Sequence, residues 1–130
     1  MNPISELVAL LRSNAAELKE GVYVYSIVPI NMDLSRIDTV AVFKEIEGVT
    51  VIVSEREAEK ARLPILFRVV WITLSQPPNS NIALLSQSME ELGLNCNIVA
   101  AVYHNHLFVP VDVASEVVAR LRSADTSRCE

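Results

Sequence analysis

The segment from Ile65 to Leu74 (ILFRVVWITL) limits the possible folds of this chain more than any other. It is rich in β-branched and aromatic side chains, which favour strands. Apart from Arg68, it is apolar on both faces, whereas a strand with one face in water would alternate polar and apolar residues. The segment therefore predicts a strand in the interior of a sheet.

The residues after this strand predict a helix, a hairpin and a second helix. Ser80 is suited to cap the first helix and Gly93 to close it. Asn97 to Tyr103 and His106 to Val109 have the composition of strands and are separated by a candidate turn. Apolar residues then recur at helical spacing up to about Arg122. The second half is thus strand–helix–strand–strand–helix.

The first half opens with a predicted helix and a strand. Asn2 followed by Pro3 is a typical helix start, and apolar residues recur at helical spacing up to about Gly21. Val22 to Val28 then alternates in the manner of a strand.

A hairpin and a short helix follow in the first half. Val40 to Ile46 and Val49 to Val53 are predicted strands, joined by a tight turn at Glu47-Gly48. Ser54 and Glu57 have the spacing of a capping box, which predicts a helix that begins directly after the hairpin.

Hairpin followed by helix therefore occurs twice, at Val40–Arg62 and at Asn97–Arg122. This repeat predicts two related halves, of which the first lacks one helix. We expect the first half at residues 1–64, the second at 65–123, and a disordered tail at 124–130. Helices that alternate with antiparallel hairpins predict an α+β fold in which the helices pack on an antiparallel sheet.

Composition narrows the class of protein. Of the 130 residues, 51% are apolar and 21% are charged, which is enough to build a packed interior. The formal net charge of −5 disfavours nucleic acid as a partner, because phosphate backbones are repelled. We expect neither a signal peptide nor a membrane-spanning segment from the patterns of residues, and Cys96 and Cys129 show no disulfide pattern. We expect a cytoplasmic protein that does not bind a membrane.

Three stretches carry a resemblance to a known family. They are Leu94 to Pro110 (LNCNIVAAVYHNHLFVP), Val42 to Val53 (VFKEIEGVTVIV) and Phe67-Arg68. In these stretches the chain resembles small standalone bacterial proteins with two ACT-like modules. The resemblance covers the chain from about Gly21 to Arg122.

The resemblance implies ferredoxin-like βαββαβ modules and a regulatory role. ACT modules often pair side by side, and a small ligand, typically an amino acid, binds where two modules meet. Leu66 to Ser123 supplies βαββα, so the sixth strand would come from Val22 to Val28 or from a partner chain. The implied partners are a small polar ligand such as an amino acid, a second copy in a homodimer, and a regulated enzyme of unknown identity. No cofactor is implied.

The implied ligand site lies at the loop before the predicted helix of the second half and on the strand after that helix. Backbone N–H groups at a helix start can hold a carboxylate, and the Asn97 amide can donate to and accept from a head group. Helix capping by Asn79 and Ser80 explains the same loop without any ligand. The candidate ligand-binding residues are Ser75, Gln76, Asn79, Ser80, Asn81, Ile82, Asn97 and Ile98.

His104 and His106 are a second candidate site, since His-x-His on one strand face can hold a metal ion. Metal sites need three or four ligands, and no Asp or Glu occurs from Gly93 to Val111. A structural or interface role for the two histidines is therefore favoured, and no metal-binding residue is predicted.

Three functions remain open at this point. The first is a regulatory module that binds a small ligand, and the second is a structural or interaction module that dimerises and binds none. The third and least favoured is an enzyme that uses Cys96 with His104 or His106, because no nucleophile motif surrounds the cysteine. No catalytic residue is predicted, and the protein is expected not to be an enzyme.

Overall fold

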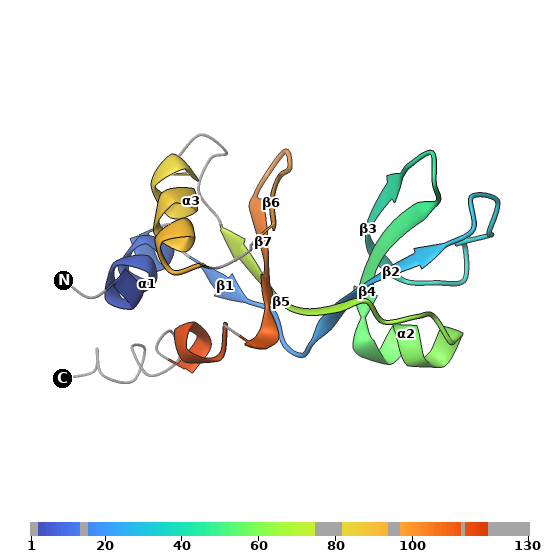
Figure 1. Ribbon diagram of the computed structural model, residues 1–130, viewed down its shortest axis with the longest axis horizontal. Coiled ribbons are helices and arrows are strands. Elements are labelled where there is room, and N and C mark those ends of the chain that lie inside the picture. Colours follow the sequence, from blue (N-terminus) through green and yellow to red (C-terminus); the bar gives the residue numbers. More distant parts are fainter. Residues whose placement is uncertain (1–2, 14–15, 75–81, 94–96, 113, 120–130) are drawn as a thin grey trace. The chain divides into compact units, whose positions relative to one another are not determined.

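The computed structural model describes residues 3–13, 16–74, 82–93, 97–112 and 114–119 (Figure 1). Strands and helices alternate along the chain, and the strand pairs whose registers are known are all antiparallel. This arrangement confirms the predicted α+β, ferredoxin-like class. The labelled elements are α1 (Pro3–Ser13), β1 (Glu17–Leu18), β2 (Tyr23–Val28), β3 (Thr39–Lys44), β4 (Val49–Ser54), α2 (Glu55–Ala61), β5 (Phe67–Leu74), α3 (Ile82–Glu91), β6 (Asn97–Ala100) and β7 (Asn105–Pro110). Residues 111–112 and 114–119 are also helical.

The chain divides into two compact units. The inner unit contains residues 20–69, and the split unit contains residues 1–19 and 70–130. Strand β5 runs from the inner unit into the split unit. The halves 1–64 and 65–123 are predicted from a repeat in the order of elements, whereas the two units are defined by their compactness. The halves therefore stay a prediction. The predicted tail at 124–130 lies outside the described residues.

The inner unit is a sheet with the strand order β3–β4–β2–β5 and one helix on it. Val24, Val51 and Val53 point to the helix side, where they form a buried cluster with Ala58 of α2. Helix α2 begins as predicted, because the Ser54 hydroxyl accepts a hydrogen bond from the backbone N–H of Glu57 at 3.1 Å. The cap fixes the helix directly at the end of β4.

The predicted hairpin of the inner unit is confirmed. Strands β3 and β4 pair antiparallel, and the backbone groups of Glu45 and Gly48 bond to each other across the turn. The turn therefore covers Glu45 to Gly48, with Ile46 92% exposed at its tip. The predicted position of the turn, Glu47-Gly48, is therefore late: strand β3 ends at Lys44, and Ile46 lies in the turn rather than in the strand.

The split unit confirms the predicted interior position of β5. One side of the strand pairs with β1, where Leu18 lies opposite Ile72, and the other side adjoins β7, which pairs with β6. One face of this sheet is covered by α1, α3 and the helical residues 114–119 (Figure 1). The buried core between them consists of Leu7, Val8, Leu11, Ile72, Leu74, Leu85, Met89, Leu107, Val109, Ala114 and Val117.

The prediction that the first helix continues to about Gly21 is wrong. Helix α1 ends at Ser13, and Glu17–Leu18 forms strand β1. The Lys19 N–H donates to the Trp71 carbonyl oxygen at 2.9 Å, and Leu18 packs against the core. Pairing with β5 therefore satisfies this backbone and buries Leu18, which outweighs the helical spacing of the local apolar residues.

The predicted strand Asn97–Tyr103 is also shorter than expected. Strand β6 ends at Ala100, and the Ala101 N–H donates to the His104 carbonyl oxygen at 2.9 Å to close a turn. Val102 and Tyr103 are each 80% exposed at its tip. The tip of the turn, Val102-Tyr103, thus precedes the expected turn at His104-Asn105 by two residues. Apolar composition alone could not reveal this, because the tip itself is apolar.

Candidate functional site

The predicted ligand-binding residues separate into two groups in the structure. Ser75, Gln76, Asn79, Ser80 and Asn81 lie outside the described residues. Ile82 is the first residue of α3, while Asn97 and Ile98 are half-buried in β6.

Asn97 and Ile98 point to opposite faces of the sheet. Ile98 packs against the core under the helices. Asn97 lies opposite Phe108 in the β6–β7 register, so the two side chains share the face that points away from α1 and α3. That face, the outer face of the split unit, is where polar and aromatic side chains gather.

The centre of the outer face is a contact between Trp71 of β5 and His106 of β7. The Trp71 Nε1–H donates a hydrogen bond to His106 Nδ1 at 3.1 Å, and the Thr73 hydroxyl oxygen lies 3.4 Å from the same nitrogen. The indole ring also stacks on the Phe108 ring, with centroids 6.0 Å apart and planes at 25°. Alternation along the two strands brings these four side chains together.

Two further charged or titratable groups border this cluster. The Lys19 ammonium lies 5.3 Å from the centroid of the Trp71 ring, a cation–π arrangement, and 3.7 Å from a carboxylate oxygen of Glu17. The ring of His104 lies 6.2 Å from that of His106, edge to face. The outer face therefore combines an apolar floor with a cation and two imidazoles.

The surroundings of His106 favour its neutral form. Burial lowers the pKa of His106 below its ordinary value of 6.5, and the nearby His104 and Lys19 lower it further. Because an indole N–H only donates, His106 Nδ1 accepts and its proton sits on Nε2. The ring thus presents a hydrogen-bond donor on the side away from Trp71.

This arrangement suits a small molecule with an anionic group, but its described residues do not supply the ligands of a metal centre. Lys19 and the His106 Nε2–H suit a carboxylate, and the aromatic floor suits an apolar side group. Among the described residues, no three His, Cys, Asp or Glu side chains come close enough to hold a metal ion. Cys96 lies outside the described residues.

Sequence reasoning singled out Asn97, His104 and His106 but missed Trp71, Thr73 and Lys19. A signal was present in the interior strand, where Trp71 and Thr73 alternate with the core residues Val70, Ile72 and Leu74. Period-two alternation places the indole and the hydroxyl on one face. The partner strand, however, could not be assigned from the sequence.

The inner unit has an apolar surface of its own, on the sheet face opposite α2. Phe67 is 65% exposed, Ile27 51% and Phe43 40%. The strand registers place all three on this face, and the Tyr25 and Phe67 rings meet edge to face with centroids 6.0 Å apart. We call the side chains of Tyr25, Ile27, Phe43 and Phe67 the apolar face.

None of the described helices is long and apolar enough to cross a membrane.

Comparisons with known proteins give a family and a structural relative. A family model described as an ACT domain matches residues 2–69. The chain is also similar to the crystal structure of a protein of unknown function from Vibrio cholerae, described as a possible transport protein. The two share 28% sequence identity with a TM-score of 0.72, over 94% of this chain and 98% of the other. No curated protein matches the sequence.

Proposed function

The chain belongs to the ACT domain family, whose members are generally regulatory modules that bind small ligands, and from this premise we propose that it binds an amino acid and regulates a separate enzyme. The proposed ligand site combines the outer face of the split unit with residues 75–82, which directly follow β5. Asn97 is its predicted polar contact on β6. We further propose that the protein works in the cytoplasm, where free amino acids and their enzymes occur.

The observation that carries the proposal is the position of Lys19 beside the Trp71–His106 contact. The ammonium offers a positive charge for the ligand carboxylate, and His106 Nε2–H offers a donor of the right kind. Asn97 shares this face through its register with Phe108, which stacks on Trp71. An amide there suits the ammonium and carboxylate groups of an amino acid.

Thermal unfolding in the presence of single amino acids tests the proposal. A ligand that binds only the native state raises the unfolding temperature in a saturable way. We expect one or a few amino acids to do so, and we expect Lys19→Gln and Asn97→Ala to weaken that response. Lys60→Gln, an exposed change on α2, is the matched control and should leave it unchanged.

The proposal fails if no amino acid raises the unfolding temperature. It also fails if an active amino acid raises the unfolding temperature of Lys19→Gln and Asn97→Ala as much as that of the Lys60→Gln control.

The apolar face supports a second candidate, an interaction module that pairs with its own copy. Exposed Phe67, Ile27 and Phe43 side chains on one sheet face are unusual for a surface in water. Pairing two copies would bury them. Sedimentation at tens of micromolar, an order-of-magnitude choice for moderate affinities, should show a dimer that Phe67→Ser weakens. A monomer under these conditions would contradict the dimer.

A further inference from the structure

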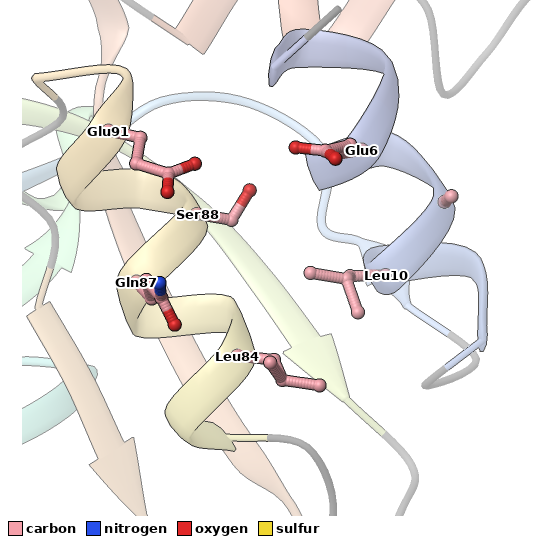
Figure 2. A pocket seen from close by; sticks show the side chains of 7 residues that line it. Glu6, Leu10, Leu84, Gln87, Ser88 and Glu91 are labelled. Atoms are coloured by element: carbon pink, nitrogen blue, oxygen red, sulfur yellow. The ribbon is translucent and has the colours of Figure 1, made fainter. Parts of the chain in front are cut away.

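A pocket lies between α1 and α3 of the split unit, and the residues that line it all belong to these two helices (Figure 2). Its volume is about 400 Å³, which is within the range of small-molecule sites. Glu6 and Leu10 of α1 face Leu84, Ser88 and Glu91 of α3 across it. The spacing of three or four residues places each set on one side of its helix.

Ser88 is the unusual residue of this pocket. It is only 6% exposed, and its hydroxyl oxygen has no hydrogen-bond partner among the described residues. Figure 2 shows the hydroxyl pointing from α3 toward α1, into the space that the pocket occupies. A buried hydroxyl without a partner destabilises a protein, so a ligand that bonds to it recovers that loss.

The charged residues around the pocket determine which charge on a ligand is favoured. The carboxylates of Glu6 and Glu91 extend toward one another from the two helices (Figure 2). None of the described residues that line the pocket is basic. Two carboxylates attract a cation and repel an anion, and the Ser88 oxygen can accept a hydrogen bond from an N–H group.

The remaining wall selects for an apolar part of the ligand. Leu10 and Leu84 reach toward each other below the carboxylates (Figure 2). Leu84 is 53% exposed although it lies on the side of α3 that faces α1. An aliphatic chain laid along these two side chains would take apolar surface from water.

We propose that this pocket binds a small aliphatic amine or diamine, with its ammonium group between Glu6, Glu91 and the Ser88 hydroxyl and its carbon chain on Leu10 and Leu84. The proposal is independent of the amino-acid site on the outer face, because no residue is shared. It adds a cation site that lies on the helical layer rather than on the outer face.

A series of four-carbon probes tests the proposal by NMR titration of the whole chain. The probes are 1,4-diaminobutane, n-butylamine, butan-1-ol and butyrate, which differ mainly in charge. We expect saturable shifts at Ser88, Leu10 and Leu84 with both amines and none with butyrate. Equal binding of butan-1-ol, shifts confined to other residues, or no shift from either amine would each overturn the proposal.

Variants separate binding from simple surface charge. We expect Ser88→Ala to weaken 1,4-diaminobutane binding roughly tenfold, since a bond to a charged group is lost. Glu91→Gln should weaken it roughly threefold, because exposed ion pairs contribute less. Two controls should leave binding unchanged. Glu59→Gln removes an exposed carboxylate from α2, and Ser26→Ala removes a buried hydroxyl of the inner unit that has no partner among the residues the structure describes. A loss of affinity in both controls equal to that in Ser88→Ala would refute the site.

Discussion

The indole Nε1–H of Trp71 donates a hydrogen bond to Nδ1 of His106 at 3.1 Å, across 35 residues of sequence. The bond links β5 to β7 on the outer face of the split unit. It also fixes the chemistry of the histidine, because a donor-only partner requires an unprotonated Nδ1. The cluster is therefore sensitive to pH.

Acid should destabilise the protein through His106. Its folded-state pKa lies below 6.5, so between those two values the unfolded chain binds the proton more readily than the native state does. The contribution to stability is complete above pH 6.5 and is lost as the pH falls through the folded-state pKa. Urea unfolding at a series of pH values from about 8 down to about 5 should show the free energy of unfolding falling in this window.

His106→Asn is the control for this pH dependence. The amide oxygen of asparagine can accept from Trp71 and does not titrate, so the fall in stability below pH 6.5 should flatten. His104→Asn removes one of the causes that lower the pKa of His106, so an NMR titration should give a higher His106 pKa in that variant. An unchanged profile in His106→Asn would contradict the assignment.

Removing the Trp71 N–H tests the same hydrogen bond through its donor. Trp71→Phe keeps an aromatic ring near Phe108 but deletes the N–H, so His106 Nδ1 keeps only the Thr73 hydroxyl at 3.4 Å. We expect the free energy of unfolding to fall by about 1 kcal/mol, which is typical of one hydrogen bond. We also expect a higher His106 pKa, because a proton on Nδ1 would no longer face the indole N–H. Urea unfolding and NMR titration measure the two effects.

Local signals in the sequence predicted the features that neighbouring residues determine. The Ser54 cap and the first hairpin are confirmed, although the turn of that hairpin begins at Glu45 and not at Glu47. Gly93 ends α3 as expected, with a positive φ of 72° that suits glycine.

Features that depend on distant segments were not predictable in the same way. Leu18 continues the helical spacing of α1, yet its pairing with Ile72 places it in a strand. The Trp71–His106 contact likewise requires knowledge of which strands are neighbours. The family match covers residues 2–69, whereas the motif run at Leu94–Pro110 lies outside it.

The two ends of α2 give a matched pair of stability predictions. Ser54→Ala removes the acceptor for the Glu57 N–H and should lower the free energy of unfolding by about 1 kcal/mol. Arg62, at the other end, has φ 59° and ψ 43°, in the left-handed region that favours glycine. Arg62→Gly should therefore raise the unfolding free energy by roughly 0.5–1 kcal/mol, measured by urea unfolding. Destabilisation by Arg62→Gly would mean that its side chain makes compensating contacts.

Ser88→Ala should have opposite effects on stability and on binding. Alanine removes a buried hydroxyl that has no partner among the described residues, and it also forms helices more readily than serine. The free energy of unfolding should therefore rise by about 1 kcal/mol, as measured by urea unfolding without ligand. Stabilisation by 1,4-diaminobutane should fall in the same variant, since binding to the native state is weaker. A serine that only packs the helix pair would give the first effect without the second, and a loss of stability in the free protein would show that its hydroxyl is already satisfied.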